Sequence, residues 1–190
     1  MRVTEFYQEA LGVKKAETAA RLAAISRLET IQKGKRIISM GEHMEMLPVL
    51  VKGALRGYLV DENGRDITDC FIFQRGDIIM GCGDFSMPSP VHIETITECQ
   101  VLMIPLTELL PMIDQPELLI LYNQQLTQAL NRHWQVKMML YQSDAMARYQ
   151  WFRRVYPGLE ELITGKHLAS FMGMTPVTLS RLRRRLREET

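Results

Sequence analysis

The stretch that decides the fold is KHLASFMGMTPVTLSRLRRRL, residues 166–186, which places apolar side chains at helical spacing around a glycine and ends in a cluster of arginines. Gly173 predicts a tight turn, because glycine adopts the left-handed backbone at little steric cost. Thr175 and Pro176 predict the start of a helix after that turn, since a threonine hydroxyl caps free backbone N–H groups and proline is tolerated at the first helical position. Two short helices joined by a turn are therefore expected.

The second of these helices, from Pro176 to about Arg187, is expected to have two unlike faces. At 100° per residue, its apolar side gathers Leu179, Leu182 and Leu186. The opposite side is polar and cationic. A small residue at Ala169, a glycine four positions later and an aliphatic residue six further on is the spacing of a helix-turn-helix. The alternative is a terminal helical hairpin with a solvated arginine face, which does not need so many arginines.

Charge is unevenly distributed along the chain, although its formal net charge is only +1. Residues 145–190 hold nine Lys and Arg against four Asp and Glu, whereas residues 1–144 hold fourteen against eighteen. This asymmetry indicates an anionic partner for the last segment alone. Arginine suits phosphate and guanine because its planar fork donates paired hydrogen bonds. The expected DNA contacts are Lys166, Thr175, Val177, Thr178, Ser180, Arg181, Arg183, Arg184 and Arg185.

The rest of the chain has the composition of a folded protein with its own core. Of its 190 residues 46% are apolar, and we find neither a run long enough to span a membrane nor a secretion signal. Residues 4–33 are expected to be helical, in one or two segments. Residues 35–105 are expected to form many short strands, as in a sandwich, barrel or jelly roll, with Asn63-Gly64 in a hairpin turn. Strand alternation places Glu94 and Glu98 toward solvent.

Residues 107–142 return to a helical pattern with a heptad-like apolar stripe. The stripe consists of Leu119, Tyr122, Leu126, Ala129, His133, Val136 and Leu140. A long helix with a narrow stripe favours pairing with a second copy of itself. Packing of the helix on the chain's own β domain is the alternative. Asp144 is expected to cap a further short helix, from Ala145 to Arg154.

With these parts in this order, the sequence resembles the bacterial cyclic-AMP receptor and fumarate–nitrate regulator (Crp/Fnr) family of transcription factors. The resemblance covers about residues 30–187 and is carried by VLVKGALRGYLVDENGRDIT, FQRGDII and HLASFMGMTPVTLSRLRRRL. It implies an α+β fold with three parts: N-terminal helices and a β-roll (jelly-roll, cyclic-nucleotide-binding-like) sensor domain in residues 1–115, a dimerisation helix in 116–143 and a helix-turn-helix domain in 144–190. It also implies a homodimer that reads a pseudo-palindromic duplex, with each second helix in a major groove.

The same resemblance assigns roles within the second helix. Arg181 aligns with a base-contacting arginine of the family, and Thr178 and Ser180 align with polar positions near the DNA backbone. Pro176 and Val177 depart from the family, which often has charged residues there. Val177 can offer only apolar contact, for example to a thymine methyl group. The preferred DNA sequence is therefore expected to differ from the family's usual one.

The effector segment GDIIMGCGDFSMPSPVHIE, residues 76–94, departs from the pattern of the family's nucleotide-binding members. In those members a Glu grips the ribose, and an Arg before Ser or Thr pairs with the cyclic phosphate. Here Gly81 or Cys82 stands at the first place and Ser89-Pro90 at the second, and no Lys or Arg occurs between Arg75 and Arg132. Binding of cyclic AMP in the usual manner is therefore not expected. If an effector pocket is used, its residues are expected to be Gly81, Cys82, Gly83, Ser89 and His92, with the amides near Gly81 and Gly83 able to hold a smaller anion.

No cofactor or metal is expected from the remaining residues. Cys82, His92 and His133 are the soft ligands that a haem or metal would use, but an apolar cysteine and surface histidines are the favoured interpretation. No cysteine precedes Cys70, so an N-terminal iron–sulfur quartet is excluded. The thirteen methionines are interpreted as ordinary core, with an apolar ligand cavity as the alternative.

The first functional hypothesis is a cytoplasmic, homodimeric DNA-binding transcription regulator. Its expected partners are double-stranded promoter DNA, a second copy of the chain, RNA polymerase and an unidentified small-molecule effector, without a membrane. The alternative is a ligand-binding sensor or scaffold with lost or altered DNA recognition, which the pair Pro176-Val177 supports. An enzyme is not expected, since no Ser/His/Asp cluster, phosphate loop or metal motif appears.

Overall fold

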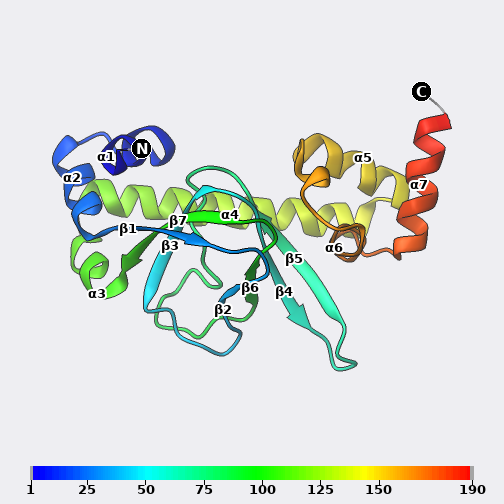
Figure 1. Cartoon of the computed structure of the whole chain (residues 1–190), viewed down its shortest axis with the longest axis horizontal. Coiled ribbons are helices and arrows are strands. Elements are labelled where there is room, and N and C mark those ends of the chain that lie inside the picture. The colour runs from blue at the N-terminus through cyan, green and yellow to red at the C-terminus, as the bar shows by residue number, and fades with distance from the viewer. Residues whose placement is uncertain (1, 189–190) are drawn as a thin grey trace. The chain divides into compact units, whose positions relative to one another are not determined.

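Two helices open the part of the chain that the computed structural model describes, residues 2–188. They are α1 (Val3–Leu11) and α2 (Ala16–Ile25) (Figure 1). The expectation of helix as far as residue 33 is wrong beyond Ile25, because Arg27–Ile31 form strand β1, which pairs antiparallel with β7. The alanine-rich sequence that favours helix ends before this segment, and the available partner strand decides its conformation.

Seven strands within residues 2–188 form two sheets. They are β1, β2 (Arg36–Ile38), β3 (Met46–Lys52), β4 (Leu55–Val60), β5 (Asp66–Ile72), β6 (His92–Thr95) and β7 (Cys99–Pro105). One sheet has the order β1-β7-β3 and the other β2-β6-β4-β5. Leu50 and Val101 of the first sheet share a buried cluster with Leu55 and Ile93 of the second. The sheets therefore enclose a common core, and the β-roll expected from the sequence is confirmed.

The expected helix over residues 107–142 is interrupted near its start. The structure has α3 (Leu106–Leu109), a 3-10 turn η1 (Leu110–Met112) and then the long helix α4 (Pro116–Gln142). Pro111 lies in the 3-10 turn, where its fixed φ and missing N–H are tolerated better than inside an α-helix. The C-terminal part contains α5 (Ala145–Val155), the 3-10 turn η2 (Leu159–Glu161), α6 (Gly165–Phe171) and α7 (Pro176–Glu188).

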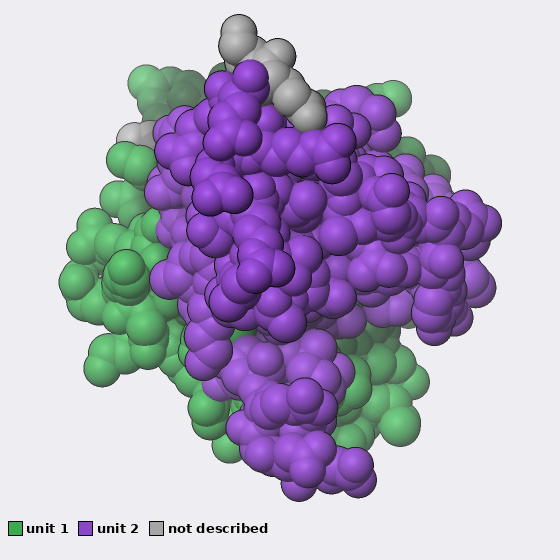
Figure 2. Space-filling model, turned by 90° about the vertical axis from the view of Figure 1, so that its right-hand side faces the viewer, with its two compact units in different colours: residues 1–57, 71–129 green, residues 58–70, 130–190 purple. Residues whose placement is uncertain are grey.

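The chain divides into two compact units (Figure 2). The first comprises residues 1–57 and 71–129, and the second comprises residues 58–70 and 130–190. The first unit has a second buried cluster, in which Phe6, Tyr7 and Leu22 of α1 and α2 pack with Leu47 of β3 and Leu102 of β7. The N-terminal helices are thus an integral part of the first unit and share a core with its strands.

A buried ion pair corrects the expectation that Glu94 faces solvent. Arg56 of β4, whose side chain is 3% exposed, donates from Nε and Nη2 to Glu94 Oε1 of β6, with 2.7 Å for each contact. Residues 55–58 of β4 are all buried, so strict alternation between an exposed and a buried face fails in this part of the strand. Arg56 and Glu94 compensate each other's charge in a site where an isolated charge would be costly.

The turn between β3 and β4 requires a glycine at position 53. Gly53 has φ +111°, and a Cβ at this position would lie 2.6 Å from the carbonyl oxygen of Glu98 and 2.6 Å from Cys99 Sγ. A side chain would therefore meet both backbone strain and a steric clash with the neighbouring strand.

We predict that Gly53→Ala lowers the free energy of unfolding by about 3 kcal/mol, since strain and overpacking each cost roughly 1–3 kcal/mol. Gly41→Ala is the matched control, because Gly41 has φ +84° but a Cβ there would meet no atom within 4 Å. The control is expected to lose only about 1 kcal/mol, from strain alone. Urea denaturation of both variants measures the difference, and equal losses would contradict the close approach at Gly53.

Candidate nucleic-acid interface and effector region

Two capped helices and a left-handed glycine build the C-terminal motif. The Thr164 hydroxyl accepts the backbone N–H of His167 at 3.2 Å, and the Thr175 hydroxyl accepts that of Thr178 at 3.1 Å. Gly173 lies between α6 and α7 with φ +62°. The turn and the cap predicted from the sequence are confirmed, and so is the helix-turn-helix fold.

The two helices of the motif are held together by a small apolar core. Leu168 and Ala169 of α6 are fully buried, as are Met172 just after it and Leu179 of α7, whereas Leu182 is only half-buried. Against this core packs an aromatic cluster in which the ring centroids of Phe152, Tyr156 and Phe171 lie 5.1–6.0 Å apart. The apolar side of α7 is thus fixed mainly at its first half.

The opposite side of α7 is exposed and cationic. The exposed residues of the expected DNA-contact set are Lys166, Thr175, Val177, Ser180, Arg181, Arg184 and Arg185. Thr178 is half-buried, and its hydroxyl lies 2.9 Å from that of Thr175 at the start of the helix. Val177, which is 59% exposed, is the large apolar side chain on this surface.

Arg183 differs from Arg184 because its side chain is partly buried against another element of its own unit. Its Nε and Nη2 each lie 2.8 Å from Glu160 Oε1, which also accepts the hydroxyl of Tyr149 at 2.7 Å. The Arg183 side chain is 33% exposed, compared with 75% for Arg184. Glu160 therefore joins α5, η2 and α7, and Arg183 stabilises the position of the helix.

Arg148 makes a second set of contacts within the same unit. Its Nη2 donates to the carbonyl of Leu140 at 2.6 Å, its Nε to that of Ser143 at 2.8 Å and its Nη1 to those of Met172 and Gly173 at 3.1 and 3.4 Å. A Cβ at Gly173 would lie 3.3 Å from Arg148 Nη1. The turn of the motif thus needs glycine for two reasons, its positive φ and this close approach.

Ser170 of α6 connects the motif to the β4–β5 hairpin, whose tip belongs to the same unit. The Ser170 hydroxyl accepts the N–H of Thr68 at 2.9 Å and donates to the carbonyl of Asp66 at 3.3 Å. The roles of Arg148, Glu160 and Ser170 were missed in the sequence, because their partners are far away along the chain and no local spacing indicates them.

We predict that Arg183→Met lowers the free energy of unfolding by about 1 kcal/mol, a value reduced for partial exposure to solvent. Arg184→Met is the control, since both side chains of the ion pair between Arg184 and Glu188 are exposed. Such a pair contributes only a few tenths of a kcal/mol to stability. Thermal unfolding monitored by circular dichroism gives both values. If Arg184→Met were the more damaging change, Glu160 would not have the anchoring role assigned to it.

The expected dimerisation stripe on α4 is only partly exposed. Tyr122 donates a hydrogen bond from its hydroxyl to the carbonyl of Gly83, and a Cβ at Gly83 would lie 2.7 Å from Leu126. These two side chains therefore contact the chain's own effector segment. Of the other stripe residues, Leu119, Ala129 and His133 are exposed and Val136 and Leu140 are half-buried.

The expected effector residues are held mainly by local structural contacts. Ser89 is 3% exposed, and its hydroxyl donates to the carbonyl of Val91 at 2.6 Å. His92 Nδ1 accepts the N–H of Met40 at 3.0 Å, and Cys82 Sγ lies 3.5 Å from the N–H of Asp84. Gly81 packs against Ser89. Within residues 2–188, no three His, Cys, Asp or Glu side chains are grouped in a way that could hold a metal ion.

The structure therefore has a β-roll of the cyclic-nucleotide-binding type, followed by a long helix and a helix-turn-helix. Residues 28–116 match the family described as the cyclic nucleotide-binding domain. No curated protein matches the chain by sequence. Among residues 2–188, no helix combines the length and apolar character that crossing a membrane requires.

Several solved structures share this fold over most of their length. FixK2 from Bradyrhizobium japonicum is 20% identical, over 87% of this chain and 86% of that chain, with a TM-score of 0.72. The c-di-GMP responsive global regulator CLP from Xanthomonas campestris is 18% identical, over 92% and 93%, with a TM-score of 0.74. A crp/fnr-family protein from Eubacterium rectale is 18% identical, over 96% and 88%, with a TM-score of 0.75. Residues 28–116 thus match the cyclic nucleotide-binding domain family, and the chain has the fold of Crp/Fnr regulators, which confirms the resemblance seen in its sequence.

Proposed function

We propose that the chain is a transcription regulator that binds double-stranded promoter DNA as a homodimer, in the cytoplasm, with RNA polymerase as a further partner. The observation that carries this proposal is the exposed cationic side of α7, which stands opposite a buried apolar side. A helix of this kind enters the major groove, and two copies read half-sites about one helical turn apart. We expect the chain to bind a specific duplex sequence, with an affinity that falls steeply as the salt concentration rises, because phosphate contacts release counterions.

The arginines of α7 are proposed to have separate roles. Arg181 is exposed near the first turns of the helix, where base edges are contacted in this docking geometry. Arg184 and Arg185 are exposed further along and serve as phosphate contacts. Val177 offers an apolar surface to a thymine methyl group.

We predict that Arg181→Ala reduces discrimination between the selected site and single-base variants by about 1–3 kcal/mol, because a bidentate base contact is lost. Arg154→Ala is the control, since Arg154 is an exposed arginine of α5 outside the motif. Selection of sites from a random duplex library, followed by mobility shifts at several salt concentrations, measures base preference and salt dependence. Unchanged base preference in Arg181→Ala would refute the assignment.

The homodimer is proposed to form through an apolar face of α4 that stays exposed in the single chain. This face contains Leu130, Trp134, Met138 and Tyr141, which are 57%, 51%, 46% and 77% exposed. Their spacing of four, four and three residues puts them on one side of the helix. Large apolar side chains gathered in this way are typical of an interaction surface. The face is offset from the side that carries Tyr122 and Leu126.

We predict that Trp134→Glu converts the dimer to monomer at micromolar concentration, because it buries a charge in the centre of the seam. Ala129→Glu is the comparison, since Ala129 is exposed on the stripe expected from the sequence. The molecular mass of each variant in sedimentation equilibrium shows which of the two faces of α4 forms the dimer. Loss of the dimer only in Ala129→Glu would assign the interface to the sequence-derived stripe instead.

The effector domain is proposed not to bind cyclic AMP in the family's usual manner. A buried cyclic phosphate requires a cation, and no Lys or Arg occurs between Arg75 and Arg132. The Ser89 hydroxyl is already bonded to the Val91 carbonyl.

The second candidate function is a ligand-binding sensor or scaffold with altered DNA recognition, which the exposed Val177 after Pro176 favours. Absence of any preferred duplex in the site selection, with the dimer intact, would support this second function over the first.

A further inference from the structure

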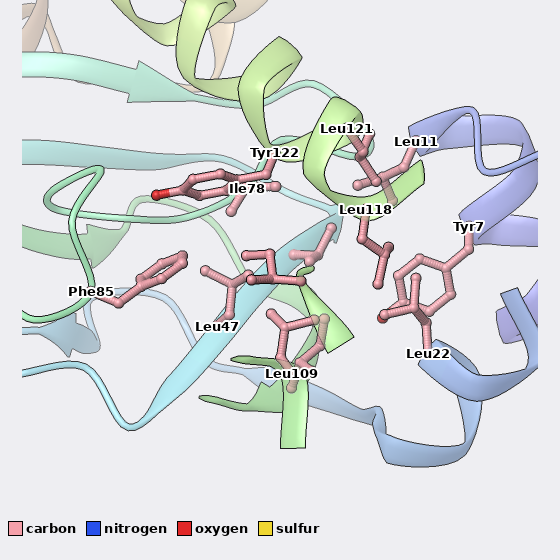
Figure 3. A pocket seen from close by; sticks show the side chains of 13 residues that line it. Tyr7, Leu11, Leu22, Leu47, Ile78, Phe85, Leu109, Leu118, Leu121 and Tyr122 are labelled. Atoms are coloured by element: carbon pink, nitrogen blue, oxygen red, sulfur yellow. The ribbon is translucent and has the colours of Figure 1, made fainter. Parts of the chain in front are cut away.

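A small apolar cavity lies in the first unit, and Figure 3 shows side chains from several elements pointing into it. Its volume is about 50 Å³. Residues that line it include Leu11, Leu22, Leu47, Phe85, Leu109 and Leu118. They come from α1, α2, β3, the effector segment, α3 and α4, so the cavity lies where the N-terminal helices meet the β-roll.

The wall of the cavity is chemically uniform. Its lining residues are Leu, Ile, Val, Phe and Tyr, without a charged side chain. The two tyrosine hydroxyls are engaged elsewhere, that of Tyr7 with Ser26 Oγ at 2.5 Å and that of Tyr122 with the carbonyl of Gly83. Burial raises the pKa of Tyr7 to about 12, so its hydroxyl stays protonated and uncharged even well above physiological pH. A water molecule needs two to four polar partners, and this wall does not provide them.

The cavity is distinct from the effector pocket residues expected from the sequence. Gly81, Ser89 and His92 do not line it. It nevertheless touches the same loop, because Phe85 lies in its wall and packs on Tyr122 with 5.7 Å between ring centroids. Leu118, Leu121 and Tyr122 of α4 complete that side of the cavity. A molecule inside would therefore contact both the effector loop and the first turns of the long helix.

We propose that this cavity binds the alkyl end of a small neutral ligand, and that the ligand acts as an effector through α4. The effector role rests on the function proposed above, whereas the binding site does not. An engineered apolar cavity of about 150 Å³ binds benzene and xenon; the smaller volume here selects xenon or the end of an alkyl chain. The cavity is partly open, so the remainder of a longer ligand can stay outside.

The binding experiment uses the full chain, methyl-labelled at Leu and Val, with xenon and 1-hexanol as probes. Saturable chemical-shift changes are expected at the methyl groups of Val49, Leu109 and Leu118, and not at Leu130, which is exposed on α4. Absence of saturable shifts, or equal shifts at Leu130, would overturn the site. Cyclic AMP is the competing probe, and saturable shifts of the cavity methyls with cyclic AMP but not with the alkyl probes would overturn the ligand class.

Two variants change the cavity in opposite directions. Leu109→Ala enlarges it and should bind 1-hexanol about fourfold more tightly for each further methylene buried. Val49→Leu fills it and should weaken xenon binding at least fivefold. Leu110→Ala is the control, because Leu110 is 42% exposed next to Leu109. If Leu109→Ala does not fold, Val49→Leu still tests whether xenon binds in this cavity. Unchanged xenon affinity in Val49→Leu would refute the site.

The effector role is tested by duplex binding of the wild-type chain with and without 1-hexanol at saturation. A change in the apparent Kd of several-fold is expected for wild type and is expected to disappear in Val49→Leu. Saturable methyl shifts without any change in the Kd for the duplex would overturn the effector role, but the binding site would still be supported. Absence of specific duplex binding in both conditions would instead refute the proposed DNA function, and the methyl shifts would still stand.

Discussion

The second unit depends on the guanidinium of Arg148, which binds carbonyl oxygens at two helix ends. The last carbonyls of a helix have no partner within it, and they form the negative end of its dipole. Arg148 satisfies those of Leu140 in the last turn of α4 and of Met172 at the end of α6. One rigid, permanently charged fork thus fixes the turn of the helix-turn-helix to the end of the long helix.

In the same unit, some arginines bind acceptors of the chain itself and others are exposed, a difference that the composition of the segment does not show. Arg148 and Arg183 are partly buried and bind oxygen acceptors of the chain itself, whereas Arg181 and Arg184 are exposed. The arginines that bind internally hold the scaffold, and the exposed ones give α7 its positive surface. The number of arginines in the sequence therefore overestimates the cations available to a polyanion, because Arg183 is paired with Glu160.

Local signals explain which features could be predicted from the sequence. Gly173, Thr175 and Pro176 lie within four residues and specify the turn and the second helix without reference to the rest of the chain. Strand β1 could not be predicted, because its conformation is decided by pairing with β7, far along the sequence. Glu94 was misplaced for a similar reason, since its ion-pair partner Arg56 lies on another strand, 38 residues away along the chain. The cavity gives no sequence signal, because each of its leucines has the pattern of ordinary core.

The chemistry of an effector for this domain depends on the lack of Lys and Arg between Arg75 and Arg132. A ligand shifts an equilibrium only by the difference in its affinity for the two states. For a cyclic nucleotide that difference would come from a cation closing on the phosphate, and the segment between Arg75 and Arg132 contains none. The ring contact between Phe85 and Tyr122 is apolar, and the Tyr122 hydroxyl joins the loop to α4 by its hydrogen bond to the Gly83 carbonyl. Under the effector role proposed above, a change in this domain is driven by the filling or emptying of apolar space, which depends on ligand shape and size and only weakly on salt.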